Sequence, residues 1–536
     1  MQFFLWSPFL LAVIFMLPRL LSPQFGLLDD GLMLQTTAKM AQGNWQMWDI
    51  QRAGRFRPIY WLYLTGVSIL GGMKPLDFFL ANTIVLLLIL FLTRIILTKL
   101  GCTQWMVWVS LVLFLTSIPV IENFFTLSKG EPLQLLFSLL AVAIVLDLDG
   151  RKKHPGRTLR IGAAAIFSAF SIATKETGLV QLLIAIAWYV LDLFASRRGR
   201  AVLEQSWLKS YVMAVFFGTV FYSIANLWMV GSSQFSSGYS STFTSIQLSG
   251  IVHNAIRWTG WILQDFPYLF PIIVGFAVSY YRGHRLPHVL MGASVWMCGW
   301  IAVLLPWKFA RSYYLLPFAL GVAVFSGWVL TAELGNQWYR QGLGRILKVL
   351  IMASFLLLVT ITLINGYSDA RIQLLVDRQN RAILDTVAEE LGQDSRLYVN
   401  IQDRNELVDE IATQLVVVYG REDILFNHIQ GDSHVSHDDR AGTFIMVPIV
   451  QNQPMLTVRM GVLEMYVDRW NEDLSQMVDQ IADQELAFHA GSIILNRLEI
   501  PRILCRWTPT LTYCDNTAPL IDRRTFQYGW RLLAVE

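Results

Sequence analysis

Charged residues are scarce in this chain. Of its 536 residues, 15% are Asp, Glu, Lys or Arg and 54% are hydrophobic, whereas an average soluble domain has about 25% charged residues. This composition excludes an ordinary soluble globular protein and indicates a membrane protein.

Lysine is absent from residues 366 to 536, where 15 Arg stand against 26 Asp and Glu. Residues 1 to 365 have the opposite balance, with 27 Lys and Arg against 13 acids. The chain therefore has a basic part and an acidic part, with a boundary near Leu363–Ala370. The acidic surplus of the second part argues against nucleic acid as a partner.

Several catalytic motifs are also missing. The sequence has no GxxxxGK[ST] phosphate loop, no HExxH zinc motif and no internal repeat. Nucleotide-driven transport through this chain alone is therefore not expected. The stretch His434–Asp439 could bind a metal, but it is interpreted as a solvated loop because it lacks the usual ligand spacing.

Long apolar runs dominate the first part. A spanning helix needs about 20 apolar residues. Runs that approach this length lie at 2–21, 76–98, 103–121, 132–148, 160–174, 177–195, 209–230, 258–281, 286–305, 311–331 and 345–365. We therefore expect a polytopic α-helical membrane protein with about eleven spans. The shorter run Pro58–Gly72 is interpreted as a juxtamembrane or re-entrant helix on the outer side.

The basic loops set the expected orientation, because Lys and Arg favour short cytoplasmic loops. Such clusters occur at 94–99, 151–160, 197–200, 282–285 and 340–348. Neighbouring clusters are separated by two spans, so all five fall on one side. This places the N-terminus in the cytoplasm, and the loop 22–75 and the acidic tail outside. The first run is expected to be an uncleaved anchor, because it lacks a basic n-region and a cleavage site.

The outer side nevertheless carries basic residues close to the span ends. These residues are Arg52, Arg55, Arg57, Lys129, Lys175, Lys308 and Arg311. Acids alternate with them at Asp29, Asp30, Glu131 and Glu176. Cations that persist against the positive-inside trend indicate an anionic partner at the outer membrane surface.

The order of these motifs carries a resemblance. The acidic pair after the first span is followed by "GRFRPIYWLY", a "KGE" loop, a "TKE" turn and "WKFARSYYLLPFALG". Over residues 1 to about 330, this arrangement resembles the GT-C class of integral-membrane glycosyltransferases, and within it the bacterial aminoarabinose transferases and the protein O-mannosyltransferases.

The resemblance implies transfer of a sugar from a polyprenyl-phosphate-linked donor to a lipid, glycan or protein acceptor. The reaction would take place on the outer face of the cytoplasmic membrane. Asp29 matches the family's catalytic carboxylate, Arg57 and Lys175 match basic residues that hold the donor phosphate, and Glu131 falls where relatives carry a second acid. Other expected partners are membrane lipids.

The residue chemistry agrees with that implication. A carboxylate beside a like-charged neighbour has a raised pKa and can take the proton of an acceptor hydroxyl. A phosphate leaving group calls for fixed guanidinium and ammonium groups. The catalytic candidates are Asp29, Asp30 and Glu131. The donor-phosphate candidates are Arg55, Arg57, Lys129, Lys175 and Arg311. A single displacement predicts inversion at the anomeric carbon, and the alternative is a double displacement through a covalent glycosyl carboxylate. A divalent metal ion is one candidate cofactor.

Each assignment has an alternative. Asp29 could cap the following helix, Arg55 and Arg57 could extend to lipid headgroups, and Lys175 could pair only with Glu176. Arg311 lies in a good interfacial anchor of aromatic and basic residues. For the whole chain, the alternative function is a lipid or polysaccharide transporter or assembly protein without glycosyl transfer.

The acidic tail is predicted to form an extracytoplasmic α/β domain. Helical patterns at 369–391 and 404–420 alternate with strand patterns at 396–401, 443–450, 491–498 and 526–535. Cys102 and Cys298 lie in or beside spans and are expected to be free. Cys505 and Cys514 lie in the tail and form a candidate disulfide.

Overall fold

A computed structural model of the protein describes most of the chain. The described residues are 2–27, 30–45, 55–148, 156–197, 206–243, 248–281, 287–307, 311–334, 342–399, 405–428, 442–451, 484–498, 521–523 and 525–535. Several residues named in the sequence analysis lie outside these ranges: Asp29, Arg52, Lys308, His434–Asp439, Cys505 and Cys514.

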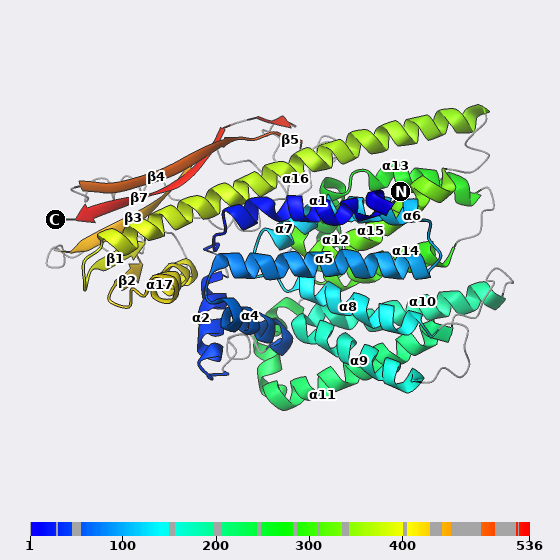
Figure 1. Cartoon of the computed structure of the whole chain (residues 1–536), viewed down its shortest axis with the longest axis horizontal. Coiled ribbons are helices and arrows are strands. Elements are labelled where there is room, and N and C mark those ends of the chain that lie inside the picture. Colours follow the sequence, from blue (N-terminus) through cyan, green and yellow to red (C-terminus); the bar gives the residue numbers. More distant parts are fainter. Residues whose placement is uncertain are drawn as a thin grey trace.

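The first part of the chain is a bundle of helices (Figure 1). Its α-helices are α1 (Gln2–Leu21), α2 (Asp30–Ala41), α4 (Pro58–Gly71), α5 (Pro75–Lys99), α6 (Gln104–Leu115), α7 (Ile118–Phe124), α8 (Glu131–Leu146), α9 (Arg157–Thr174), α10 (Val180–Arg197), α11 (Ser206–Phe243), α12 (Leu248–Asp265), α13 (Leu269–Tyr281), α14 (His288–Leu304), α15 (Leu316–Trp328) and α16 (Gly342–Glu390). Short helical turns η1 (Glu176–Leu179), η2 (Ser312–Leu315) and η3 (Val329–Glu333) join or extend them.

Local sequence signals explain several helix starts. Proline stands in the first two positions of α4, α5, α7, α8 and α15, where its missing N–H removes no helical hydrogen bond. Thr103 caps α6 by accepting a hydrogen bond from the backbone nitrogen of Met106 at 3.2 Å.

Among the described residues, five helices are long and apolar enough to cross a membrane, or up to seven if each of two bent helix pairs is one span. The bent pairs are α6 with α7, at 59°, and α12 with α13, at 94°. Every apolar run expected from the sequence falls on a helix or bent pair, but several of these helices are short. The chain is thus a multi-pass helical protein, and the number of about eleven spans stays a prediction.

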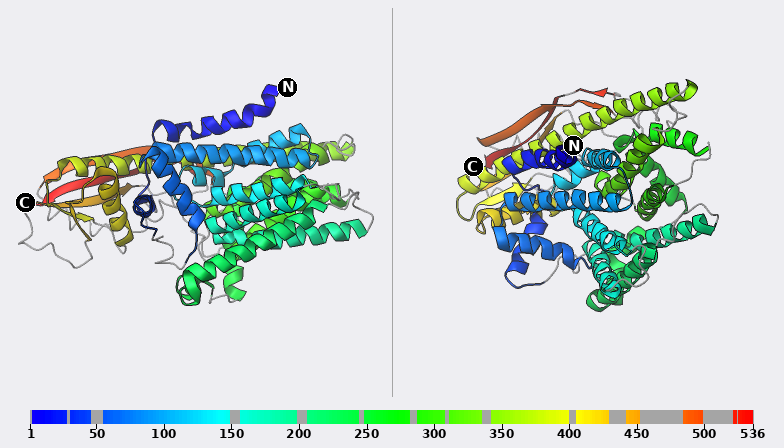
Figure 2. Two further views of the ribbon diagram at one scale, coloured as in Figure 1. Left: turned by 60° about the horizontal axis from the view of Figure 1, so that its bottom comes forward. Right: turned by 45° about the vertical axis from the view of Figure 1, so that its right-hand side comes forward.

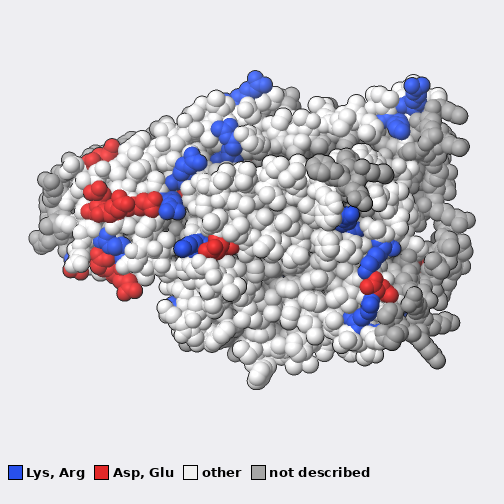
Figure 3. Space-filling model, viewed as in Figure 1, with Lys and Arg blue, Asp and Glu red and all other residues white. Residues whose placement is uncertain are grey.

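Charged side chains gather at the two ends of the bundle. On the face shown in Figure 3, Lys, Arg, Asp and Glu flank a broad band of uncharged residues. At the end away from the sheet, Asp147 pairs with Lys99 and, at 2.9 Å, with Arg160. The basic clusters at 94–99 and 151–160, which were expected on one side, therefore meet at this end of the bundle.

The second part of the chain forms a sheet beyond the other end of the bundle (Figures 1 and 2). Its elements are β1 (Arg396–Val399), α17 (Asn405–Tyr419), β2 (Leu425–His428), β3 (Thr443–Gln451), β4 (Gln484–Ile494), β5 (Arg497–Leu498), β6 (Ile521–Asp522) and β7 (Thr525–Val535). Five strands pair in the order β2-β1-β3-β7-β4. The β1 strand runs parallel to both neighbours, and β7 runs antiparallel to β3 and β4.

One face of this sheet packs on α16 and α17. Val387 of α16 and Ile411 of α17 belong to the same buried cluster as Trp530 of β7. Asn380 of α16 accepts hydrogen bonds at 2.8 Å from the Trp530 indole nitrogen and from the Tyr528 hydroxyl. The tail therefore contains a sheet with helices on it. However, β2 and β6 were not expected, and β4 begins at Gln484, before the strand predicted at 491–498.

The boundary expected near residue 366 falls inside α16, which runs without interruption from the bundle into the sheet (Figure 1). Gly366 lies close to α7, and a Cβ there would come 2.5 Å from Ile121. Asn365 exchanges two hydrogen bonds of 3.0 Å with the backbone of Leu498. The composition changes at this point, but the backbone does not turn. The division into two domains stays a prediction.

Candidate functional site

A cavity of about 520 Å³ opens among helix ends at the end of the bundle that faces the sheet. Its walls include the first turn of α2, the segment before α4, the loop before α8, the turn after α9 and the end of α14. Four cations line it, Arg55, Arg57, Lys129 and Lys175, against the two acids Glu131 and Glu176. Four of the five predicted donor-phosphate residues are thus brought together.

The segment before α4 contributes the two arginines. Pro58 begins α4, and a residue before proline avoids the helical region, so Arg57 has φ −121° and ψ 53°. Phe56, between the arginines, packs against Tyr222 of α11, whose hydroxyl donates to the Phe56 carbonyl at 3.1 Å. The Arg57 guanidinium lies 5.3 Å from the ring centre of Tyr60. The arginine segment is therefore fixed from both sides.

Lys175 lies in the extended break between α9 and η1. Its ammonium group pairs with the Glu131 carboxylate of α8. One turn further along α8, the buried Gln134 side chain donates to the Lys175 carbonyl at 2.8 Å. The alternative pairing of Lys175 with Glu176 is wrong, because Glu131 is its partner.

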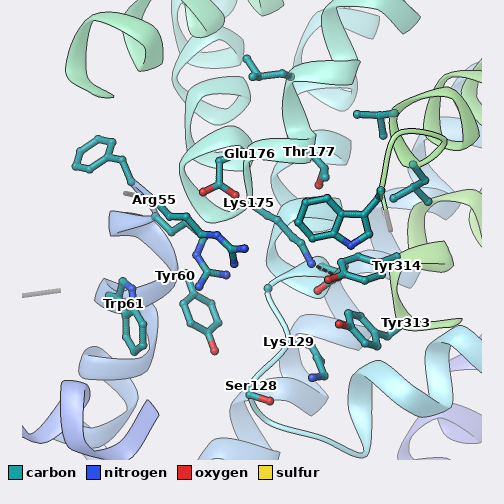
Figure 4. Close-up of a pocket in the computed structure, with 18 of the residues that line it drawn as sticks. Arg55, Tyr60, Trp61, Ser128, Lys129, Lys175, Glu176, Thr177, Tyr313 and Tyr314 are labelled. Carbon is teal, nitrogen blue, oxygen red and sulfur yellow. Dashed lines mark hydrogen bonds and ion pairs between the residues drawn. The ribbon is translucent and has the colours of Figure 1, made fainter. Parts of the chain in front are cut away.

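Two tyrosines of η2 complete this wall. The Lys129 nitrogen lies 4.5 Å from the ring centre of Tyr313, and the Lys175 nitrogen lies 4.2 Å from that of Tyr314. Asn123 of α7 holds the turn by donating to the Tyr313 carbonyl at 2.8 Å. Aromatic faces stabilise cations, so both ammonium groups are kept near the cavity. Figure 4 shows Arg55 and Tyr60 facing these groups from the opposite wall.

The electrostatics of the cavity favour an anion. Burial lowers the pKa of Lys175 from 10.5 to about 8; Glu131 opposes this effect, and the charges of Arg57 and Lys129 add to it. A buried group of like charges is stabilised when an anion enters among them.

The three catalytic candidates are placed differently. Glu131 lies in the cavity wall, paired with Lys175. Asp30 begins α2, and its carboxylate accepts a hydrogen bond from the Gly26 nitrogen at 2.8 Å. Asp30 is outside the set of described residues that line the cavity, although Leu32 and Met33 of the same helix are in it. Asp29, the predicted catalytic carboxylate, lies outside the described residues.

Two further predictions have partial outcomes. Arg311 is outside the cavity lining as far as the chain is described, whereas Tyr313 and Tyr314, two and three positions later, are part of it. The described residues contain no group of three or more His, Cys, Asp or Glu side chains that could hold a metal ion. Cys102 and Cys298 are free, as expected.

Sequence reasoning missed Tyr60, Gln134, Tyr313 and Tyr314. The tyrosines stand in two stretches that the sequence analysis names, "RPIYW" and "ARSYYLL". The first was interpreted only as the start of a juxtamembrane or re-entrant helix, and the aromatic residues of the second were interpreted as an interfacial anchor. The available signal for these tyrosines was that each stands two or three positions after a candidate arginine, Arg57 or Arg311. For Gln134 the sequence contains no signal, because its role depends on the approach of α8 to the turn after α9.

No protein-family model matches the sequence, and no curated protein matches it. Among solved structures, the fold is similar to that of ArnT from Cupriavidus metallidurans bound to undecaprenyl phosphate, at 12% identity and a TM-score of 0.44, covering 97% of this chain and 96% of that one. It is also similar to an Archaeoglobus fulgidus oligosaccharyltransferase tethered with an acceptor peptide, at 12% identity and a TM-score of 0.48, covering 79% of this chain and 64% of that one. A third structure is the arabinofuranosyltransferase AftD from Mycobacteria, at 11% identity and a TM-score of 0.48, covering 99% of this chain and 40% of that one.

These structures are GT-C glycosyltransferases, the class that the sequence resembles. The chain spans less than two thirds of the oligosaccharyltransferase and of AftD.

Proposed function

We propose that the chain is a membrane glycosyltransferase that moves a sugar from a polyprenyl-phosphate-linked donor to a lipid, glycan or protein acceptor. The observation that carries the proposal is the cavity in which Arg55, Arg57, Lys129 and Lys175 converge from three separate segments. Four cations in a cavity that is also lined by apolar and aromatic side chains suit a phosphate attached to a lipid.

The proposed reaction is a single displacement. A carboxylate takes the proton of the acceptor hydroxyl, and the acceptor oxygen forms a bond to the anomeric carbon. The bond from that carbon to the phosphate oxygen breaks, and its electron pair stays on the phosphate. The cations of the cavity stabilise the charge that develops there. This geometry inverts the anomeric carbon.

The roles of the individual residues follow from their contacts. Arg55 and Arg57 are suited to two-pronged binding of phosphate oxygens, and Lys129 and Lys175 supply point charges. Glu131 is proposed as the counter-ion of Lys175, because its carboxylate already binds that ammonium group. Asp29 is proposed as the base, since it directly precedes α2, whose Leu32 and Met33 line the cavity. The proposed location is the outer face of the cytoplasmic membrane.

The direct test is a transfer assay of the purified protein with a panel of polyprenyl-phosphate sugars. Wild type should consume one donor, and Asp29→Asn should lower kcat at least about 100-fold, the usual range for loss of a general base. Undecaprenyl phosphate binding should stay within about twofold in that variant. Equal turnover by the variant, or no donor consumption by wild type, would favour a lipid transporter or assembly protein.

A further inference from the structure

Helix α17 of the acidic part packs directly against α2 of the first loop (Figure 1). Gly31 of α2 makes this approach possible. A Cβ at Gly31 would collide with the Glu410 carboxylate and would lie 2.8 Å from the Glu410 carbonyl oxygen. A larger residue would force the two helices apart.

Two buried side chains of α17 hold the first loop by its backbone. Glu410 accepts a hydrogen bond from the Leu32 nitrogen at 3.1 Å, and Gln414 donates to the Gly26 carbonyl at 2.6 Å. Glu410 and Gln414 are four positions apart on α17, so they lie on the same face of the helix. Their exposed fractions are 1% and 4%. The chain is therefore attached to α17 on both sides of the acidic pair, at Gly26 and at Leu32.

The hydrogen bond to Leu32 has the character of a helix cap. Leu32 is the third residue of α2, and the N–H at this position normally bonds to the side chain of the residue before the helix. Here Glu410, 378 positions away in the chain, is an acceptor for that N–H. Its negative charge also suits the positive end of α2.

The same loop enters the hydrophobic core of the acidic part. Leu27 is fully buried and belongs to the cluster of α16, α17 and the sheet that includes Ile411 and Leu415. Leu32, in contrast, lines the cationic cavity. One short segment thus joins the core of the second part to the wall of the candidate site.

We infer that Glu410 and Gln414 are positioning residues that hold the start of α2, whose Leu32 and Met33 line the cavity. The acidic part of the chain is then a component of the working site through α17. This inference rests on the proposed function of the cavity, and it predicts that a change in α17 alters turnover more than donor binding.

The test compares Glu410→Ala with Glu410→Gln in the full-length protein. The alanine variant should lower kcat at least tenfold while binding of undecaprenyl phosphate stays within twofold. Hydrogen–deuterium exchange of the peptide that contains Leu32 should accelerate at least tenfold. The glutamine variant should retain turnover within threefold, because its amide oxygen can still accept from the Leu32 nitrogen.

Asp409→Ala is the matched control, because Asp409 is the adjacent acid on α17 and is exposed. It should change neither exchange nor kcat. If Glu410→Ala does not fold, Gln414→Ala tests the same attachment through Gly26. Unchanged exchange at Leu32 in Glu410→Ala would overturn the inference, as would a fall in kcat matched by an equal loss of lipid binding.

The exchange readout does not depend on enzymatic activity. If no donor is consumed by wild type, the proposed function fails, and faster exchange in Glu410→Ala still supports the attachment of the loop to α17. The two failures are therefore distinguishable.

Discussion

Two buried ion pairs occupy different regions of the molecule. Lys175 and Glu131 pair in the wall of the cavity, and Arg19 of α1 pairs with Asp377 of α16 at 2.6 Å in the seam between these helices. The side chains of the seam pair are 0% and 2% exposed, whereas that of Lys175 is 14% exposed. The chemistry of the two pairs is similar, but their surroundings differ.

In the seam, the Arg19 guanidinium lies between aromatic rings, 5.1 Å from the centre of Phe79 and 5.5 Å from that of Phe125. In the cavity, Lys175 has Arg57 and Lys129 as charged neighbours. The seam pair is thus enclosed and serves the fold. The cavity pair lies beside further cations in the wall of an open cavity, where we propose that an anion binds.

The largest effect is expected when the seam pair is broken. Arg19→Met leaves the Asp377 carboxylate buried without its partner, which costs about 3–5 kcal/mol of unfolding free energy. Thermal or denaturant unfolding in detergent measures this loss. The double variant Arg19→Met/Asp377→Leu should recover most of it, because no charge is then left buried. If the double variant is destabilised as much as Arg19→Met, the loss of stability does not come from the unpaired Asp377 carboxylate.

Breaking the cavity pair should lower stability less than breaking the seam pair, and it should weaken lipid binding more. Lys175→Met removes one of the four cations, so the Kd for undecaprenyl phosphate should rise at least about tenfold, or about 1.4 kcal/mol. The free energy of unfolding should change less than in Arg19→Met, because Glu131 lines a cavity that Arg57 and Lys129 also line, whereas Asp377 lies in an enclosed seam. Equilibrium binding and unfolding on the same preparation separate the two effects, and an unchanged Kd would contradict this role of Lys175.

The pH dependence of binding should follow Lys175. Because its pKa is lowered to about 8, the ammonium is charged below pH 8 and loses its proton above it. Affinity for undecaprenyl phosphate should therefore fall about threefold to tenfold between pH 7 and pH 9. A phosphate monoester, with a second pKa of about 6, is fully ionised over most of this range and does not cause the fall. Lys175→Arg should flatten the profile, and a fall of the same size in that variant would refute the assignment.

The smallest effect is expected at the opposite end of the bundle. Lys99 and Asp147 form a pair whose side chains are 36% and 42% exposed, and such pairs contribute at most about 1 kcal/mol. Lys99→Ala should change neither lipid binding nor turnover, and should lower stability only slightly. A large loss of binding in this variant would show that cations anywhere on the chain affect the lipid.

Much of the cavity was predictable because topology limits the possibilities. Once the spans are counted, the segments with Arg57, Lys129 and Lys175 fall on the same side, and each lies near a helix end. The sequence also indicated the helices and most strands of the acidic part, since their periodicities are local.

The rest depends on packing between distant segments. Glu410 meets Leu32 across 378 positions, and Asn123 meets Tyr313 across 190. No local pattern encodes such contacts. The continuity of α16 was not predicted for another reason. The boundary near Leu363–Ala370 was drawn from a change in charge balance, which does not determine where a helix ends. In the structure, Gly366 allows the close contact with α7 and Asn365 bonds to Leu498.

The most direct measurement of the central claim compares two lipids that differ only in the phosphate. Undecaprenyl phosphate and undecaprenol are titrated against wild type and Arg57→Ala at pH 7. Wild type should bind the phosphate lipid at least about tenfold more tightly than the alcohol, and Arg57→Ala should lose most of that difference. Equal affinity of wild type for the two lipids, or an undiminished preference in Arg57→Ala, would contradict the account of the cavity as a lipid-phosphate site.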